Sequence, residues 1–251
     1  MGSLKNQTYA IVQARMGSTR LPGKVMLKIV GKPMLELMIE RLRRASELDG
    51  IVVATTDRAT ERPIVDLINS LEGILLFRGS EDDVLARYHG AAVKYNAKTI
   101  VRVTADCPLI EPAVIDKIVK AYHKLSVSID YASNIRRRTY PRGLDVEVFS
   151  FLSLDKARKE ATLMSDREHV TEYILQRPFI FRMCDVVDDV DNSFMRWTVD
   201  MPEDFELITK IYESLYPKNH NFTYYDVLQL LKRNPDWNMI NSHIKQKSYG
   251  E

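Results

Sequence analysis

Short apolar runs rich in β-branched residues alternate with longer amphipathic segments over the first half of the chain. The short runs lie at 9–14, 51–56, 74–77 and 99–105. Between them, segments 35–45 and 85–95 carry apolar residues at helical spacing, which gives each segment one apolar face. This alternation predicts βαβ units, and therefore an α/β fold with a mostly parallel sheet flanked by helices.

The rhythm changes after residue 126. Strand-like runs follow at 129–134, 143–151 and 179–186. Helical patterns occur near 153–161, 165–176, 202–216 and 223–233. Because strands here follow one another with fewer helices between them, we expect a mixed or antiparallel extension of the sheet. The chain shows neither a repeat nor a linker, so we expect a single domain over residues 1–251.

Four loops follow the first four predicted strands. They lie at 13–24, 55–60, 77–84 and 105–109. Ligands of open α/β sheets bind outside the carboxyl ends of the strands. We therefore expect these loops to meet along one edge of the sheet and to form the ligand site.

The first of these loops, "QARMGSTRLPGK", is rich in glycine and positive charge but is not a P-loop. Five residues separate Gly17 from Gly23, one more than the P-loop spacing allows. Val25 follows Lys24 where a P-loop has the Ser or Thr that binds magnesium. If this loop binds phosphate, it must do so as a loop of a different kind.

The composition of the same loop still favours phosphate binding. Arg15, Arg20 and Lys24 supply three positive charges directly after a buried strand. Guanidinium groups grip phosphate oxygens with two N–H groups, and a lysine can follow charge that develops on a reacting phosphorus. Gly17 and Gly23 allow backbone conformations that other residues resist. The alternative is a solvated basic turn.

Composition narrows the class of protein. A net charge of +2, with acidic and basic residues interspersed, argues against a dedicated nucleic-acid binder and leaves small anionic ligands as candidates. Cys107 and Cys184 are too few for a disulfide framework and suit a reducing compartment. The chain has neither an apolar stretch of about 20 residues nor a signal-peptide core, so we expect a cytoplasmic protein without membrane insertion.

Six segments carry a resemblance to a known family. The segment "ARMGSTRLPGKVMLKIVGKPML" resembles the signature loop of the sugar-acid cytidylyltransferases, which include CMP-KDO synthetase and acylneuraminate cytidylyltransferase. The chain is most similar to the branch of spore coat polysaccharide biosynthesis protein F. The other segments with counterparts in that branch are "FRGSEDDVLARY", "RVTADCPLI", "YPRGLDVEV", "REHVTEYI" and "RWTVDMPEDFELI".

The resemblance implies a fold and an activity. The fold would be a Rossmann-like nucleotide-diphospho-sugar transferase sheet, with nucleotide binding in about 1–125, acceptor binding and dimerisation in about 126–200, and C-terminal helices in 201–251. The activity would be a magnesium-dependent transfer of CMP from CTP to a sugar or sugar acid in surface polysaccharide biosynthesis, with release of pyrophosphate. The partners would be CTP, the acceptor and a second copy of the chain, since related synthetases form dimers.

The resemblance also implies roles for the nucleotide-side residues. Lys24, Arg15 and Arg20 would be catalytic, with Lys24 nearest the α-phosphate. Further nucleotide contacts would come from Ala14, Gly17, Ser18 and Thr19 of the first loop and from Arg78, Gly79 and Ser80 of the third. For the third loop, the start of a helix is an equally good interpretation, because acidic residues follow directly.

Two aspartates are the predicted magnesium ligands, and each has a simpler interpretation. Asp106 follows a buried strand at the ligand edge, but an Asp shortly before Pro108 also forms ordinary turns. Asp200 precedes Pro202 and acidic residues, as the N-cap of a helix does. The resemblance assigns both to the metal.

Residues after 126 are candidates for the acceptor site. Arg142 would hold an acidic substrate, and Asp145 or Glu147, placed on one face of a predicted strand, its hydroxyl groups. The alternative is an exposed basic loop beside a strand edge protected by charges. His169, on a predicted helix capped by Ser165 or Asp166, is a candidate base, although a single His is more often structural.

Other functions stay open on the sequence alone. A glycosyltransferase that consumes a nucleotide-sugar would typically bind its metal through D-x-D, which "ADCP" does not match. A nucleotide-binding module without turnover is the alternative from another class. The sequence identifies neither the acceptor sugar nor a residue that must select cytosine.

Overall fold

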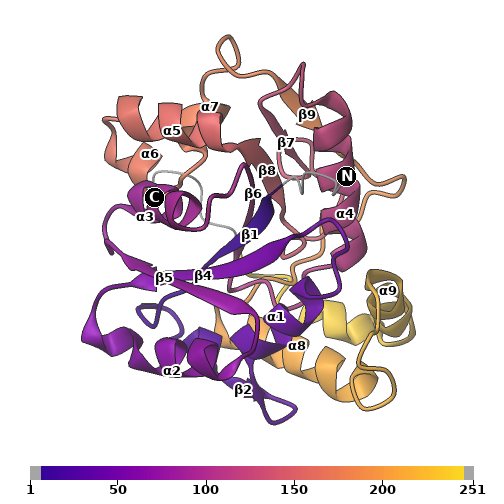
Figure 1. Cartoon of the computed structure of the whole chain (residues 1–251). Coiled ribbons are helices and arrows are strands. Elements are labelled where there is room, and N and C mark those ends of the chain that lie inside the picture. The colour runs from indigo at the N-terminus through magenta and orange to yellow at the C-terminus, as the bar shows by residue number, and fades with distance from the viewer. Residues whose placement is uncertain (1–6, 246–251) are drawn as a thin grey trace, which may run out of the picture.

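The computed structural model describes residues 7–245, which form one central sheet with helices on both faces (Figure 1). The sheet has the strand order β5-β4-β1-β6-β8-β7-β9. In chain order the strands are β1 Thr8–Gln13, β4 Gly50–Thr56, β5 Ile74–Gly79, β6 Thr99–Thr104, β7 Tyr131–Ser133, β8 Glu147–Ser150 and β9 Met183–Asp185. A separate two-stranded sheet joins β2 Lys28–Ile29 to β3 Lys32–Pro33.

The direction of the strands confirms the predicted parallel sheet and its mixed extension. β5, β4, β1 and β6 are parallel to one another. β8 runs antiparallel to both β6 and β7, and β9 is parallel to β7. Since β8 is reversed, it begins at the edge where β6 and β7 end, with Glu147 opposite Arg102 and Ser133. The residues just before β8 therefore lie at the ligand edge.

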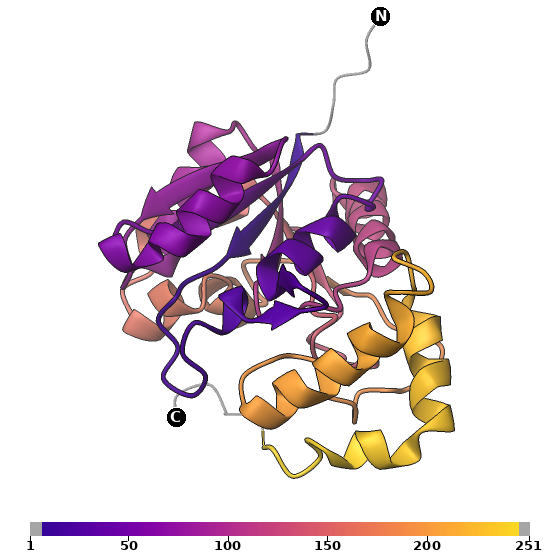
Figure 2. The same cartoon turned by 90° about the horizontal axis from the view of Figure 1, so that it is seen from below.

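Helices cover the two faces of the sheet. They are α1 Met34–Leu42, α2 Arg62–Ser70, α3 Val84–Lys94, α4 Pro112–Leu125, α5 Phe151–Glu160, α6 Met164–Glu168, α7 Glu172–Leu175, α8 Pro202–Leu215 and α9 Tyr224–Arg233. Short 3-10 helices are η1 Lys24–Met26, η2 Ala59–Glu61 and η3 Pro235–Met239. Figure 2 shows α8 and α9, orange to yellow, packed beside the layer that contains α1. No helix within residues 7–245 has the length and apolar character needed to cross a membrane.

Alternate residues of the central strands belong to two separate apolar cores. Ala10 and Val12 of β1 pack with α1, α2, α4, α8 and α9, whereas Ile11 packs with α3, α5 and α7 on the other face. Successive side chains of a strand point to opposite faces, so a strand covered on both sides is apolar throughout. This is why the first four strands appear as continuous apolar runs in the sequence.

One predicted helix is divided in the structure. The segment 165–176 contains α6 and α7, separated near Val170, whose φ of 60° lies in the left-handed region. A β-branched residue rarely adopts this conformation, and it ends the helical path. The predicted caps are wrong, because α6 begins at Met164 and both Ser165 and Asp166 lie inside it.

A close backbone contact brings the segment before α8 to the ligand edge. Arg142 pairs with Arg196 in a parallel bridge, with bonds from Arg142 N to Met195 O (3.0 Å) and from Trp197 N to Arg142 O (2.7 Å). Gly143 has a φ of 103°, and a Cβ there would lie 2.6 Å from the carbonyl carbon of Trp197. Only glycine permits this approach.

A second backbone contact follows further along the same segment. Val199 N donates to Asp106 O at 2.8 Å, which places Asp200 beside Asp106.

Candidate active site

A cavity of about 510 Å³ lies at the carboxyl ends of β1 and β6. It contains most of the nucleotide-side residues predicted from the sequence. Those that line it are Ala14, Arg15, Gly17, Ser18, Thr19, Arg20, Lys24, Asp106 and Asp200. Gln13, Val25, Glu81, Thr104 and Ala105 also line it and were missed. These five residues adjoin predicted positions in the sequence. Only Glu81 carries a charge that could have indicated a role; the other four have no such signal.

The loop after β1 is held by a small set of backbone contacts. Gly23 adopts a φ of 65° and donates from its N–H to Met16 O at 3.1 Å. Ser18 Oγ accepts from Leu21 N at 3.3 Å. The positive φ explains glycine at 23, whereas Gly17 has no such φ and a Cβ there would meet only Glu81 Oε1 at 3.9 Å. The expected backbone role therefore holds for Gly23 and not for Gly17.

A buried glutamate that no sequence pattern indicates, Glu61, supports the loop through hydrogen bonds. Glu61 is buried, and its Oε2 accepts from Met16 N at 3.0 Å and from Thr55 Oγ1 at 2.9 Å. These bonds join the loop after β1 to the end of β4. No motif indicates this role, because Glu61 lies in a segment whose sequence shows only a turn followed by a helix.

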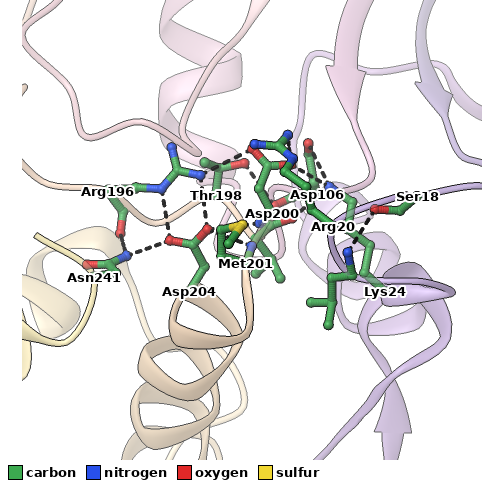
Figure 3. Close-up of polar contacts among 12 residues, drawn as sticks. Ser18, Arg20, Lys24, Asp106, Arg196, Thr198, Asp200, Met201, Asp204 and Asn241 are labelled. Atoms are coloured by element: carbon green, nitrogen blue, oxygen red, sulfur yellow. Dashed lines mark hydrogen bonds and ion pairs between the residues drawn. The ribbon is translucent and has the colours of Figure 1, made fainter. Parts of the chain in front are cut away.

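Lys24 is the centre of the site (Figure 3). Its Nζ donates to Asp200 Oδ1 at 2.7 Å, to Val199 O at 2.7 Å and to Asp106 Oδ2 at 3.3 Å. Burial acts to lower the pKa of Lys24, but the charges and hydrogen bonds of Asp106 and Asp200 outweigh it and raise the pKa above its ordinary value. The lysine is therefore charged at neutral pH and joins both carboxylates.

Asp200 faces the cavity and does not cap the following helix. Its Oδ1 also contacts Arg20 Nη2 at 3.1 Å, and its Oδ2 accepts from Arg196 Nη2 at 3.2 Å. Burial acts to raise the pKa of Asp200, but Lys24, Arg20 and Arg196 hold it below its usual value. Met201 is the N-cap residue of α8, and Asp204, at the third position of the helix, accepts with its Oδ2 from the backbone N–H groups of Asp200 and Met201 at 3.0 Å each. The capping interpretation of Asp200 is wrong.

Asp106 and Asp200 have the chemistry of a two-carboxylate magnesium site. Both reach the same ammonium group, so both can reach one cation. Magnesium commonly takes one or two carboxylates and completes its octahedral shell with phosphate oxygens and water. Within residues 7–245 there is no cluster of three or more His, Cys, Asp or Glu that could hold a metal. The two aspartates fit a magnesium ion that is bound together with a phosphate ligand.

The three predicted residues of the third loop, Arg78, Gly79 and Ser80, lie outside this cavity, although Glu81 of the same loop lines it. Arg78 donates from Nε to Thr56 O at 3.1 Å and from Nη2 to Arg58 O at 3.0 Å, which joins the ends of β4 and β5. Ser80 Oγ accepts from Asp83 N at 3.1 Å, and Asp83 caps α3. Neither these residues nor Gly79 lines the cavity. The helix-start interpretation describes Ser80 well, and a base or ribose contact of this loop stays a prediction.

The candidates for the acceptor site are dispersed. Arg142 lines a second cavity of about 350 Å³, next to Trp197. Asp145 precedes β8 and does not share a strand face with Glu147; it binds Arg138, with Nη2 to Oδ2 at 3.0 Å. His169 is the C-cap residue of α6, is half-buried and is not among the residues that line the main cavity.

Glu147 is part of the interior of the sheet. It is 3% exposed, forms an ion pair with Arg102, and accepts hydrogen bonds from Tyr131 Oη at 2.7 Å and Thr171 Oγ1 at 2.6 Å. A carboxylate with three internal partners is not free to bind a sugar hydroxyl. The arrangement contradicts the interpretation of Glu147 as an acceptor ligand.

Similarity to known proteins identifies the class. A family model of the cytidylyltransferases matches residues 9–230, so the chain belongs to the cytidylyltransferase family. Spore coat polysaccharide biosynthesis protein SpsF of Bacillus subtilis is 31% identical over 238 residues, covering 92% of this chain and 96% of SpsF. An uncharacterised protein of Methanocaldococcus jannaschii is 39% identical over 243 residues, covering 96% and 97%.

A solved structure confirms the fold. A cytidylyltransferase from Leptospira borgpetersenii superimposes with a TM-score of 0.88 at 32% identity, covering 96% of this chain and 99% of that one. Together with the strand order, this establishes the Rossmann-like nucleotidyltransferase fold that the sequence predicts.

Proposed function

We propose that the protein is a magnesium-dependent cytidylyltransferase that transfers CMP from CTP to a hydroxyl of a sugar or sugar acid in surface polysaccharide biosynthesis. The observation that carries the proposal is the convergence of Lys24, Arg20, Asp106 and Asp200 in one cavity at the carboxyl edge of the sheet. Membership of the cytidylyltransferase family and the similarity to SpsF support the same function.

The reaction needs charge neutralisation and alignment more than covalent chemistry. The acceptor hydroxyl attacks the α-phosphorus, the bond from the α-phosphorus to the bridging oxygen breaks, and pyrophosphate leaves. In this proposal Arg15 and Arg20, on the rim of the cavity, hold the phosphate oxygens. Lys24 stabilises the charge that develops at the α-phosphate. The acceptor's proton passes to solvent or to a group of the acceptor site.

Asp106 and Asp200 would hold the magnesium ion. When bound, the ion supplies positive charge that neutralises and orients the phosphates. Lys24 lies between the two carboxylates and contacts both. Binding of the triphosphate offers the ammonium group phosphate oxygens as new acceptors, so Lys24 can leave the carboxylates for the reacting phosphate.

The proposal includes a homodimer. Exposed apolar side chains gather along α5 to α7 and the segment after them. They are Leu152, Leu163, Met164, Phe179 and Ile180. Beside them β9 is the last strand of the sheet, so one of its edges is open to pairing. Light scattering over a wide concentration range tests this: we expect a dimer mass for the wild type and a monomer mass for Phe179→Asp, and a wild-type monomer throughout would contradict it.

Location in the cytoplasm is also part of the proposal. Cys107 and Cys184 are both free thiols, which suits a reducing compartment.

One assay separates the proposed function from its alternatives. The purified protein is incubated with magnesium, each of CTP, UTP, ATP and GTP, and a panel of sugars and sugar acids, and pyrophosphate release is measured. We expect release with CTP that depends on an acceptor. Cleavage of a nucleotide-sugar without pyrophosphate release would indicate a glycosyltransferase. Binding of CTP without turnover for any acceptor would indicate a non-catalytic module.

A further inference from the structure

Three buried polar side chains lie directly behind Asp200 and contact neither the magnesium ion nor the phosphates in the proposed function. They are Arg196, Asp204 and Asn241, with exposures of 7%, 0% and 3%. Figure 3 shows them in a row that leads from the C-terminal segment, through the start of α8, to the Asp200 carboxylate. Ionised groups are rarely buried this deeply unless they are paired, so their partners indicate their role.

Arg196 binds both neighbouring aspartates. It donates from Nε to Asp204 Oδ1 at 2.8 Å, and from Nη2 to Asp204 Oδ2 at 2.9 Å and Asp200 Oδ2 at 3.2 Å. The two-pronged contact with Asp204 fixes the plane of the guanidinium. The Asp200 oxygen that faces away from the cavity is therefore occupied, and Oδ1 is directed to Lys24 and Arg20.

Asp204 fixes the backbone at the same place. Its Oδ2 accepts from the N–H groups of Asp200 and Met201. Asn241 Nδ2 donates to Asp204 Oδ1 at 2.8 Å and to Arg196 O at 2.9 Å, which anchors both members of the ion pair to the C-terminal segment. The carboxylate of Asp200 is thus restrained through its side chain by Arg196 and through its main chain by Asp204.

Stability alone is a weak reason for such an arrangement. Buried ion pairs can often be replaced by apolar residues with little loss of stability, because burying charges is costly. A metal or catalytic site must hold each carboxylate oxygen in place to within a fraction of an ångström. Hydrogen bonds from neighbouring residues provide that restraint.

We propose that Arg196 and Asp204, anchored by Asn241, are positioning residues that aim Oδ1 of Asp200 at the reaction centre. The proposal rests on the proposed function, in which Asp200 serves the metal and the triphosphate. None of the three residues touches the reacting atoms. They act through the orientation of Asp200, so their loss changes the metal requirement and turnover more than the affinity for CTP.

The test compares Arg196→Lys with a matched control, Arg41→Lys. Arg41 is also buried and bound to a carboxylate, Glu111 at 2.9 Å, and to the carbonyl oxygens of Ile110 and Phe222, but it does not line the cavity. Lysine keeps the charge at either position and removes the fixed fork of N–H groups, which binds Asp204 in a two-pronged way at Arg196 and three separate acceptors at Arg41. The measurements are kcat, KM for CTP, the magnesium concentration for half-maximal rate, Mn²⁺ binding with CTP present by electron paramagnetic resonance, and thermal melting.

For Arg196→Lys we expect kcat and Mn²⁺ affinity to fall by about 10- to 100-fold, as changes behind metal ligands generally do. The KM for CTP should stay within about twofold, because the proposed phosphate contacts of Arg15, Arg20 and Lys24 do not involve Arg196. Arg41→Lys should lower the melting temperature without changing kcat or Mn²⁺ affinity. If Arg196→Lys also lowers only the melting temperature, the positioning role is wrong.

A second variant guards against misfolding. Asn241→Ala leaves every charge of the network in place and removes only two hydrogen bonds, and we expect the same direction of change with a smaller, several-fold effect. Unchanged kcat and Mn²⁺ affinity in a folded Asn241→Ala, together with a misfolded Arg196→Lys, would also overturn the proposal. Failure of the proposed function is seen separately, as a wild type that releases no pyrophosphate from CTP with any acceptor.

Discussion

The nucleotide side and the extension after residue 126 contain charged residues of the same types but use them differently. At the ends of β1 and β6, an open cavity is lined by Lys24, Arg20, Asp106 and Asp200. Asp200 binds both Lys24 and Arg20, and Lys24 also binds Asp106. In the extension, Glu147 is satisfied inside the sheet, and Asp145 is paired with Arg138. Charges that face a cavity can change partners when a ligand binds, whereas charges in a packed interior mainly preserve the fold.

The largest expected effect is that of Lys24→Ala. Removal of a preorganised cation from the reacting phosphate should lower kcat by at least about 10²- to 10³-fold. The melting temperature should change little, because Asp200 keeps Arg20 and Arg196 as partners. Steady-state kinetics and thermal melting measure both. Lys28→Ala, a change at an exposed lysine beyond η1, is the control and should be active. Normal kinetics for Lys24→Ala would show that the cavity is not the triphosphate site.

The next effect concerns the two aspartates. Asp106→Asn and Asp200→Asn each keep the shape of the side chain and remove one charge, so each should raise the magnesium requirement and lower turnover by roughly tenfold or more. The double variant should be little worse than the worse single one, because the residues act as a unit. The test is to measure the rate of each variant as a function of magnesium concentration. A wild-type magnesium dependence for Asp200→Asn would leave Asp106 as the only carboxylate on the metal.

Glu147→Gln should affect stability and leave chemistry nearly unchanged. The substitution removes the negative charge of Glu147 from its ion pair with Arg102, in a mostly buried position. Loss of one partner of a buried ion pair typically costs about 3 kcal/mol of unfolding free energy. Urea unfolding measures the loss, and kcat per folded molecule should stay within about twofold. If instead stability is unchanged and the KM for the acceptor rises, Glu147 is an acceptor ligand after all.

The smallest effect is expected for Arg142→Ala. The backbone of Arg142 makes the contacts that hold the segment before α8, and alanine preserves them. Because Arg142 lines a different cavity from Lys24, the KM for CTP should change by less than about twofold. Kinetics with CTP and acceptor varied separately provide the check. A large rise in the KM for the acceptor alone would support the sequence-based role of Arg142 as an acceptor ligand. It would also mean that the acceptor reaches the cavity that Arg142 lines.

Much of the fold follows from the sequence alone. Strands covered on both faces must be apolar throughout, so β1, β4, β5 and β6 are visible as runs without any structural knowledge. The first loop is equally visible, since its glycines and cations are adjacent in sequence and follow a strand end. The division of 165–176 at Val170 was not visible, because a left-handed valine has no local signal and is imposed by packing.

The role of Asp200 required the tertiary structure. Its local sequence describes an N-cap equally well, and only the approach of Gly143 to Trp197 and the bond from Val199 N to Asp106 O bring it to the cavity. Asp204, at the third position of α8, then binds the backbone N–H groups at the start of the helix, and the Asp200 side chain is left to contact Lys24 and Arg20. Local patterns determine secondary structure and which loops carry charge. Which of two neighbouring carboxylates faces the ligand depends on contacts between residues distant in sequence, whose energies no local pattern contains.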